Sequence, residues 1–154
     1  MPAYSFRPQF VEPIRAGTKG GTIRAGRRGR QNPFLEPREG GQARVGEEMA
    51  LYCQQRSRHG FLIKRVECVA VEPIWLDFGR MSVELRNSRT VLRSNGALLA
   101  FALFDGFNGF DEMTAFWQQT HQTDYFTGYH VRWLPLPGEI YQADPPHETR
   151  RAVP

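Results

Sequence analysis

The chain has 154 residues, a formal net charge of +4 and 40% hydrophobic residues. This length fits one domain around a single core, and the hydrophobic content excludes a wholly disordered chain. No apolar run is long enough to span a bilayer, and the N-terminus lacks a signal-peptide pattern. We therefore expect a cytoplasmic protein without a membrane partner. Its basic character is compatible with nucleic acid as a partner.

Cysteine and histidine usage gives no sign of a metal or a cofactor. Both cysteines, Cys53 and Cys68, lie in apolar-patterned runs, which predicts buried free thiols. The histidines are scattered along the chain and lack the spacing of metal ligands. They are His59, His121, His130 and His147. We expect no metal site and no cofactor.

The first half of the chain predicts several short strands and one helix. Pro8 can begin a short helix that reaches about Arg15, with Gly17 as its end and Pro13 as a weakness inside it. The strand over 61–71 has the strongest signal, with apolar and β-branched residues between Gly60 and Pro73. Strands are predicted over residues 4–6, 22–25, 48–53 and 61–71.

The second half predicts a hairpin, two helices and a last strand. Residues 81–85 and 90–92 flank an Asn-Ser turn and predict the hairpin. The apolar run 97–104 is rich in Ala and Leu and predicts a buried helix. Asn108 is a suitable N-cap for the second helix, which carries Phe110, Met113 and Trp117 on one face. Residues 126–133 alternate, with Tyr129, Val131 and Trp133 on one side and His130 and Arg132 on the other, which predicts a half-buried strand.

Charge is distributed unevenly along the chain. Residues 15–30 hold six basic residues and no acid, whereas residues 94–131 hold four acids and no Lys or Arg. Arginines in the glycine-rich basic run can contact phosphate oxygens, or they can be a solvated loop. We expect residues of about 26–43 to be a basic, mobile insertion, and the Pro-rich residues 135–154 to be a tail.

Short strands, two or three helices and no βαβ alternation predict an α+β fold. The arrangement that fits best is a small, mainly antiparallel barrel with flanking helices. This predicted fold does not by itself indicate which reaction, if any, the protein catalyses.

The segment Gly17-Thr18-Lys19-Gly20-Gly21-Thr22-Ile23-Arg24 is the most informative in the chain. Lys19 and Lys64 are the only lysines among 20 basic residues. A lysine amine can lose its proton when it is desolvated or near other cations, whereas arginine effectively never does. Lys19 is therefore either a chemically active amine or a solvated charge in a turn.

This segment resembles the Gly-x-Lys-x-x-Thr-x-Arg signature of the ASCH domain family in the PUA-like superfamily. The resemblance extends over roughly residues 3–134, including Asp105-Gly106-Phe107 and the aromatic helix after it. It is greatest to the stand-alone, phage- and prophage-associated branch. It implies a PUA-like antiparallel β-barrel with two to three flanking helices and a cleft between barrel and helices. It says nothing of the basic insertion or the tail.

The resemblance implies RNA or nucleotide binding as the first hypothesis for function. In such a cleft, phosphates pair with arginine and bases stack on rings. The residues assigned to binding are Gly20, Gly21, Arg24, Arg27, Arg28, Arg30 and Tyr52, with Trp117 and Trp133 as further ring candidates. The partner is RNA or a modified nucleoside.

A second hypothesis is an amidohydrolase that deacylates N4-acetylcytidine-type nucleosides. One subgroup of the family resembles such enzymes, which use a Lys, a Thr and a Glu. Carried over by position, these are Lys19, Thr22 and Asp105, where Asp is one methylene shorter than Glu. Thr22 is then the nucleophile, Lys19 its base, and the amides of Gly20 and Gly21 stabilise the oxyanion. A ribonuclease and a phage accessory interaction protein are further alternatives.

Overall fold

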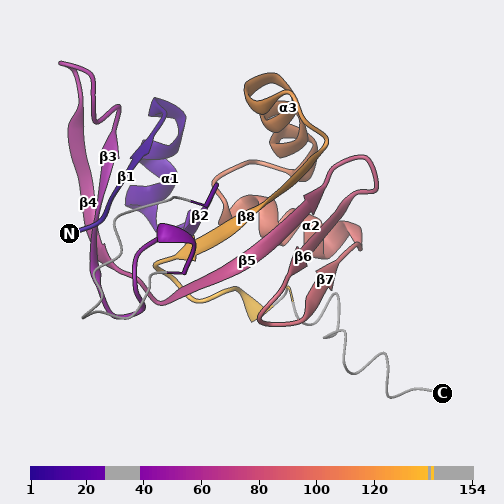
Figure 1. Ribbon diagram of the computed structural model, residues 1–154. Helices are drawn as coiled ribbons and strands as arrows, with labels where there is room; N and C mark the ends of the chain where they lie inside the picture. Colours follow the sequence, from indigo (N-terminus) through magenta and orange to yellow (C-terminus); the bar gives the residue numbers. More distant parts are fainter. Residues whose placement is uncertain (27–38, 139, 141–154) are drawn as a thin grey trace.

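The computed structural model describes residues 1–26, 39–138 and 140 (Figure 1). Its strands are β1 (Ala3–Phe6), β2 (Gly21–Arg24), β3 (Glu48–Cys53), β4 (Phe61–Glu67), β5 (Ala70–Asp77), β6 (Ser82–Leu85), β7 (Thr90–Leu92) and β8 (Tyr125–Arg132). Its helices are η1 (Pro8–Phe10), α1 (Val11–Ala16), η2 (Glu39–Gly41), α2 (Asn95–Phe104) and α3 (Phe110–His121). The expected α+β class is confirmed.

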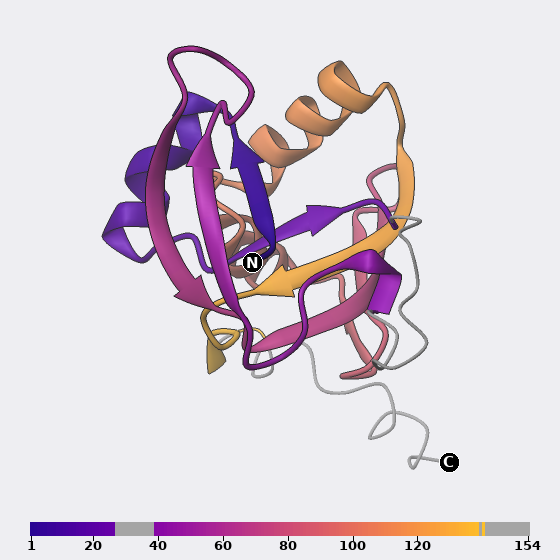
Figure 2. The ribbon, with the colours of Figure 1, turned by 60° about the vertical axis from the view of Figure 1, so that its left-hand side comes forward.

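The strands form two sheets, and neither sheet is closed into a barrel. One has the order β1-β3-β4 and the other β2-β8-β5-β6-β7. The β1–β3 pair is parallel, and every other pair is antiparallel. Figure 2 shows the strands of the smaller sheet crossing those of the larger one.

The prediction of one strand over 61–71 is wrong, because the chain passes from one sheet to the other within this range. Residues up to Glu67 pair with β3, and residues from Ala70 pair with β8. At the corner, the amide of Cys68 donates to Glu47 and the amide of Val69 donates to Arg132. The second strand continues through Pro73 to Asp77. Pro73 is tolerated because it lies at the end of the β5–β6 pairing, where only its carbonyl is used, by the amide of Arg86.

The other local predictions largely agree with the structure. Strand 48–53 has the predicted bounds, and strands 4–6 and 22–25 and the 81–92 hairpin are present with small shifts. The first helix begins as a 3-10 turn at Pro8, continues as α1 and ends at Gly17, whose φ is 79°. Asn108 is not the N-cap of α3. Gly109 occupies that position, and the Asn108 side chain instead contacts Glu112.

The C-terminal end of the last strand is buried on both faces, so the half-buried prediction is wrong for residues 130–132, whereas residues 125–129 are exposed or half-buried. His130 is 0% exposed and Arg132 is 8% exposed. The helix α2 covers their face, since His130 lies against the rings of Phe101 and Phe104. Ionisable side chains are therefore buried in the core here, and such side chains need partners inside the protein.

The core extends beyond the expected domain boundary at residue 134. Ile140 is fully buried and Leu136 packs against the core, so the first part of the Pro-rich segment belongs to the domain. Residues 139 and 141–154 lie outside the described part of the chain. The two cysteines are buried and unpaired, as predicted. Among the helices of the described residues, none has the length and apolarity needed to cross a bilayer.

Candidate functional site

The Lys19 loop is fixed at both ends by backbone hydrogen bonds. After α1, the amides of Thr18 and Lys19 both donate to the carbonyl of Pro13. The next amide, that of Gly20, donates to Phe104 at the end of α2. The motif thus crosses from α1 to α2 before it enters β2, and this crossing turns the Lys19 side chain into the protein.

The Lys19 ammonium is buried and has partners on two elements. The side chain is 2% exposed. Its Nζ donates to the carbonyl of Gly21, at 2.7 Å, and to the carbonyl of Asp105. The Oδ1 atom of the Asp105 carboxylate lies 3.6 Å from Nζ. Lys19 therefore joins the edge strand β2 to the C-terminal end of α2.

Burial lowers the pKa of Lys19 to about 8. The carboxylate of Asp105 opposes this shift, and the guanidinium of Arg24 adds to it. A buried ammonium loses the hydration that stabilises its charge, and one carboxylate does not fully replace it. Lys19 therefore titrates well below the ordinary lysine range, near pH 8.

A cluster of phenylalanine rings brings further cations to this place. The rings of Phe6, Phe10, Phe107 and Phe116 pack edge to face or tilted, with neighbouring centroids 5.2 to 6.4 Å apart. Lys19 Nζ lies 4.8 Å from the Phe10 centroid, and the Arg24 guanidinium carbon lies 5.0 Å from that of Phe6. The guanidinium carbon of Arg7 lies 5.3 Å from the centroid of Phe116. We call Arg7, Lys19 and Arg24 the cation cluster.

His121, at the end of α3, lies within the field of this cluster. Its ring stacks on Trp117 with centroids 4.3 Å apart. Burial lowers the pKa of His121, and the charges of Arg7 and Arg24 lower it further. The region between β1 and α3 is therefore electropositive, although Asp105 partly neutralises Lys19.

A polar groove of about 750 Å³ lies on the face of β1 opposite to the Tyr4 and Phe6 rings that Arg24 contacts. It is lined by Ala3 and Ser5 of β1 and by residues 54–57 of the turn after β3, which are Gln54, Gln55, Arg56 and Ser57. Arg24 donates to the carbonyl of Ser5 at 2.7 Å, so the motif arginine reaches the strand that forms one wall of the groove.

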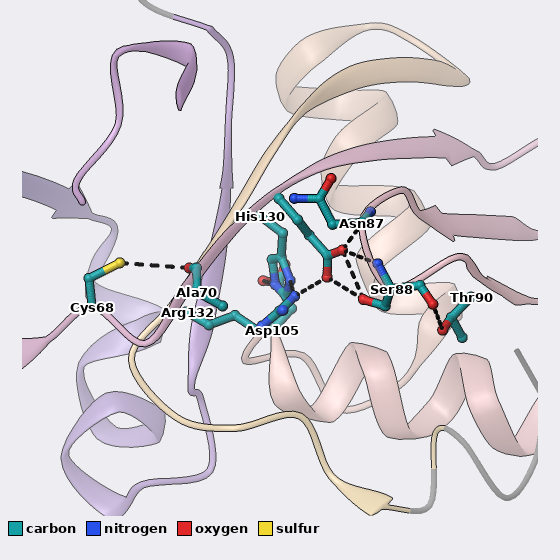
Figure 3. Close-up of polar contacts among 9 residues, drawn as sticks. Cys68, Ala70, Asn87, Ser88, Thr90, Asp105, His130 and Arg132 are labelled. Atoms are coloured by element: carbon teal, nitrogen blue, oxygen red, sulfur yellow. Dashed lines mark hydrogen bonds and ion pairs between the residues drawn. The ribbon is translucent and has the colours of Figure 1, made fainter. Parts of the chain in front are cut away.

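Behind Asp105, a chain of polar side chains runs through the core (Figure 3). His130 Nε2 lies 3.7 Å from Asp105 Oδ1, and Arg132 lies 3.2 Å from the other ring nitrogen of His130. Arg132 forms a 2.6 Å ion pair with Glu72. Glu72 also accepts hydrogen bonds from the amides of Asn87 and Ser88 and from the Ser88 hydroxyl. The site is thus connected to the β6–β7 turn.

Thr22 is buried but is not brought into hydrogen-bond contact with the lysine. Its register partner on β8 is Val131, whereas the partner of Ile23 is His130. Because adjacent residues of a strand point to opposite faces, Thr22 and His130 lie on opposite faces of the sheet. Among the described residues, no hydrogen bond joins the Thr22 hydroxyl to Lys19.

The remaining predicted residues have varied placements. A Cβ on Gly20 would lie 2.5 Å from the Phe104 ring, and one on Gly21 would lie 2.8 Å from His130 Nε2. Both glycines are therefore required by close packing, and the Gly20 amide already donates to the carbonyl of Phe104.

Tyr52 is half-buried in β3 opposite Ser5. The ring candidates Trp117 and Trp133 are both in the core. Arg27, Arg28 and Arg30 lie outside the described residues.

Four polar residues of the site were not predicted from the sequence. They are Arg7, Glu72, His130 and Arg132. One usable signal was Glu72, a carboxylate inside the apolar run 69–76, since an acid in such a run needs a buried partner.

Comparison with known proteins found no matching family model, no matching curated sequence and no matching solved structure. In the described residues, no three His, Cys, Asp or Glu side chains group as metal ligands. Function must therefore be inferred from the geometry of this chain.

Proposed function

We propose that this protein binds single-stranded RNA or nucleotides at the cation cluster and the adjoining polar groove. The observation that carries the proposal is the convergence of Lys19 and Arg24 of the motif segment and Arg7, which follows β1, on one phenylalanine cluster. Cations gathered at one place attract phosphates, and guanidinium groups can bind them through paired hydrogen bonds.

The groove supplies the kind of side chains that the rest of a nucleotide needs. Glutamine amides and serine hydroxyls line it together with Arg56, and these groups both donate and accept hydrogen bonds. Half-buried Phe116 and exposed His121 offer ring surface beside the cations. Single-stranded RNA is recognised by this combination of ring stacking, polar contacts to base edges and backbone charge.

The proposal includes an ASCH-type domain with a PUA-like barrel, in which the two sheets are the two parts of the barrel. Two contacts support this assignment. The motif residues Lys19 and Arg24 both approach the ring of Phe6, and Asp105 of the Asp-Gly-Phe segment meets the motif lysine.

Fluorescence anisotropy with labelled oligoribonucleotides tests this function. We expect binding to single strands that weakens as salt increases, because counterions are released. Arg24→Gln should weaken binding by roughly tenfold, the effect of losing about 1.4 kcal/mol from a charge-assisted contact. Arg80→Gln is the matched control, since the Arg80 side chain is 88% exposed and lies in the turn between β5 and β6. Equal affinity for both variants would reject the site.

Amidohydrolysis of N4-acylated nucleosides is the second candidate function. It is favoured by one observation, a buried lysine with a pKa of about 8 beside a carboxylate. It also requires the Thr22 hydroxyl to reach Lys19 around the edge of β2, a contact that does not occur among the described residues. Binding without chemistry therefore has the stronger support.

A further inference from the structure

Two buried polar atoms of the site face each other without hydrogen-bond partners. Asp105 Oδ1 and His130 Nε2 are the only buried side-chain N or O atoms in the described residues that have none. They lie 3.7 Å apart (Figure 3), which is longer than a hydrogen bond. Buried polar atoms almost always have a hydrogen-bond partner, so two neighbouring atoms that lack one at a candidate site require an explanation.

The position of the proton on His130 follows from its neighbours. Arg132 lies 3.2 Å from Nδ1, and a guanidinium can only donate, so Nδ1 accepts. The pKa of His130 is lowered, chiefly by burial, which keeps the ring neutral. A neutral ring with an accepting Nδ1 carries its proton on Nε2, the atom that faces Asp105. The ion pair of Arg132 with Glu72 fixes this arrangement.

Asp105 therefore lies between two donors. Its Oδ1 is 3.6 Å from Lys19 Nζ and 3.7 Å from His130 Nε2. A movement of roughly 1 Å would bring it within hydrogen-bond distance of either partner. When Lys19 is charged it compensates the carboxylate, and when Lys19 is neutral the carboxylate would be buried without a cation.

We propose that His130 is a positioning residue that shares Asp105 with Lys19 and stabilises the carboxylate when the lysine amine has released its proton. The proton leaves Lys19 for solvent or a ligand, and His130 stays neutral because Arg132 occupies its Nδ1. This inference goes beyond the proposed binding function, since it concerns the protonation of the site and holds for any ligand.

The charges that act on this pair come from four elements and the motif loop. Among the described residues, they are Lys19 of the loop, Arg24 of β2, Glu72 of β5, Asp105 at the end of α2, and His130 and Arg132 of β8. Glu72 and Arg132 neutralise each other as an ion pair. The local charge that changes with pH is therefore that of Lys19, which lies beside Asp105 and is linked through it to His130.

The scarcity of lysine allows a direct test. Lys64→Arg leaves Lys19 as the only lysine, and its ε-carbon can then be followed by NMR as pH changes. In this background, His130→Leu removes the donor to Asp105, while His130→Gln keeps an N–H at a similar distance from the backbone. We expect His130→Leu to raise the pKa of Lys19 from about 8 to about 9, by the loss of one charged hydrogen bond. His130→Gln should restore a value near the parent.

Two results would overturn the proposal. One is a Lys19 pKa that is the same, or lower, in His130→Leu. The other applies even if that variant does not fold, because it uses the Lys64→Arg protein alone. Nitrogen NMR should show the Nε2–H tautomer of His130, and its Nε2–H proton should move downfield as Lys19 loses its charge. An Nδ1–H tautomer, or an Nε2–H signal unchanged across the Lys19 titration, contradicts the sharing of Asp105.

Discussion

Asp105 Oδ1 lies 3.6 Å from Lys19 Nζ, although 86 residues separate the two in the chain. The contact joins the motif loop to the end of α2, and both side chains are almost completely buried. A buried ion pair is sensitive to the loss of one partner, because the remaining charge is left in a poorly solvated place.

Asp105→Asn should destabilise the protein more at low pH than at high pH. The variant keeps the shape of the side chain but leaves the ammonium of Lys19 without its counter-charge. We expect a loss of about 3 kcal/mol at pH 6, where Lys19 is charged. The loss should be clearly smaller at pH 9.5, where Lys19 can be neutral. Urea unfolding at the two pH values measures this, and equal losses would show that the charge of Lys19 is not involved.

The stability of the wild type should rise with pH through the titration of Lys19. The folded pKa of about 8 is below the ordinary lysine value of 10.5, so between these values the unfolded state binds more protons. Relative to Lys19→Met, the wild type should therefore gain stability from about pH 8 to about pH 10.5. The full gain is on the order of 3 kcal/mol. A difference between the two proteins that does not change with pH would contradict the lowered pKa.

The Glu72–Arg132 pair should contribute far more than a surface pair. Burial raises the pKa of Glu72, but Arg132 and Ser88 together outweigh it and hold that pKa below its ordinary value. Its stabilisation is therefore present above the unfolded pKa and lost as pH falls through the folded one. Glu72→Gln should cost about 3 kcal/mol at pH 7. Glu84→Gln, which breaks the partly exposed Arg86–Glu84 pair, should cost less than about 1 kcal/mol.

The basic segment should contribute to RNA affinity without selecting sequence. Replacing Arg27, Arg28 and Arg30 with Ala removes three charges that can contact phosphates. Binding should weaken similarly for all single-stranded sequences, and the salt dependence should become shallower. Anisotropy at several salt concentrations measures both effects. A loss restricted to one sequence would show that these arginines read bases.

Incubation with N4-acetylcytidine separates binding from hydrolysis. If the protein is an amidohydrolase, free cytidine should form, and Thr22→Ala should abolish turnover with the fold intact. Lys19→Arg should be nearly as damaging, because it keeps the charge but removes the titratable amine. Asp105→Glu can increase the rate by restoring the longer acid. Binding without turnover, retained in Lys19→Arg, would identify a binding protein in which Lys19 acts only as a cation.

The sequence predicted those features that depend on neighbouring residues. Strand 48–53 and the 81–92 hairpin follow local patterns, and the end of α1 follows from Gly17. The break between β4 and β5 could not be predicted in the same way, because Cys68 and Val69 turn only by bonding to Glu47 and Arg132. The apolar pattern continues through that corner.

The same limit applies to the candidate site. The motif indicated Lys19, and the downstream Asp-Gly-Phe segment indicated Asp105. Burial of His130 and Arg132 could not be predicted, since alternation placed them on a polar face of the strand. Their burial depends on Glu72, which is 60 residues from Arg132 in the chain. Glu72 inside its apolar run indicates that a buried partner exists, but no local pattern identifies Arg132 as that partner.

The most direct test of the proposed function follows the two lysine side chains by NMR while an oligoribonucleotide is added. We expect the Lys19 signal to shift and the pKa of Lys19 to rise above about 8, because phosphate beside Arg24 stabilises the ammonium. The exposed Lys64 is the internal control and should change little. RNA that binds by anisotropy but leaves the Lys19 signal and pKa unchanged would contradict the proposed site.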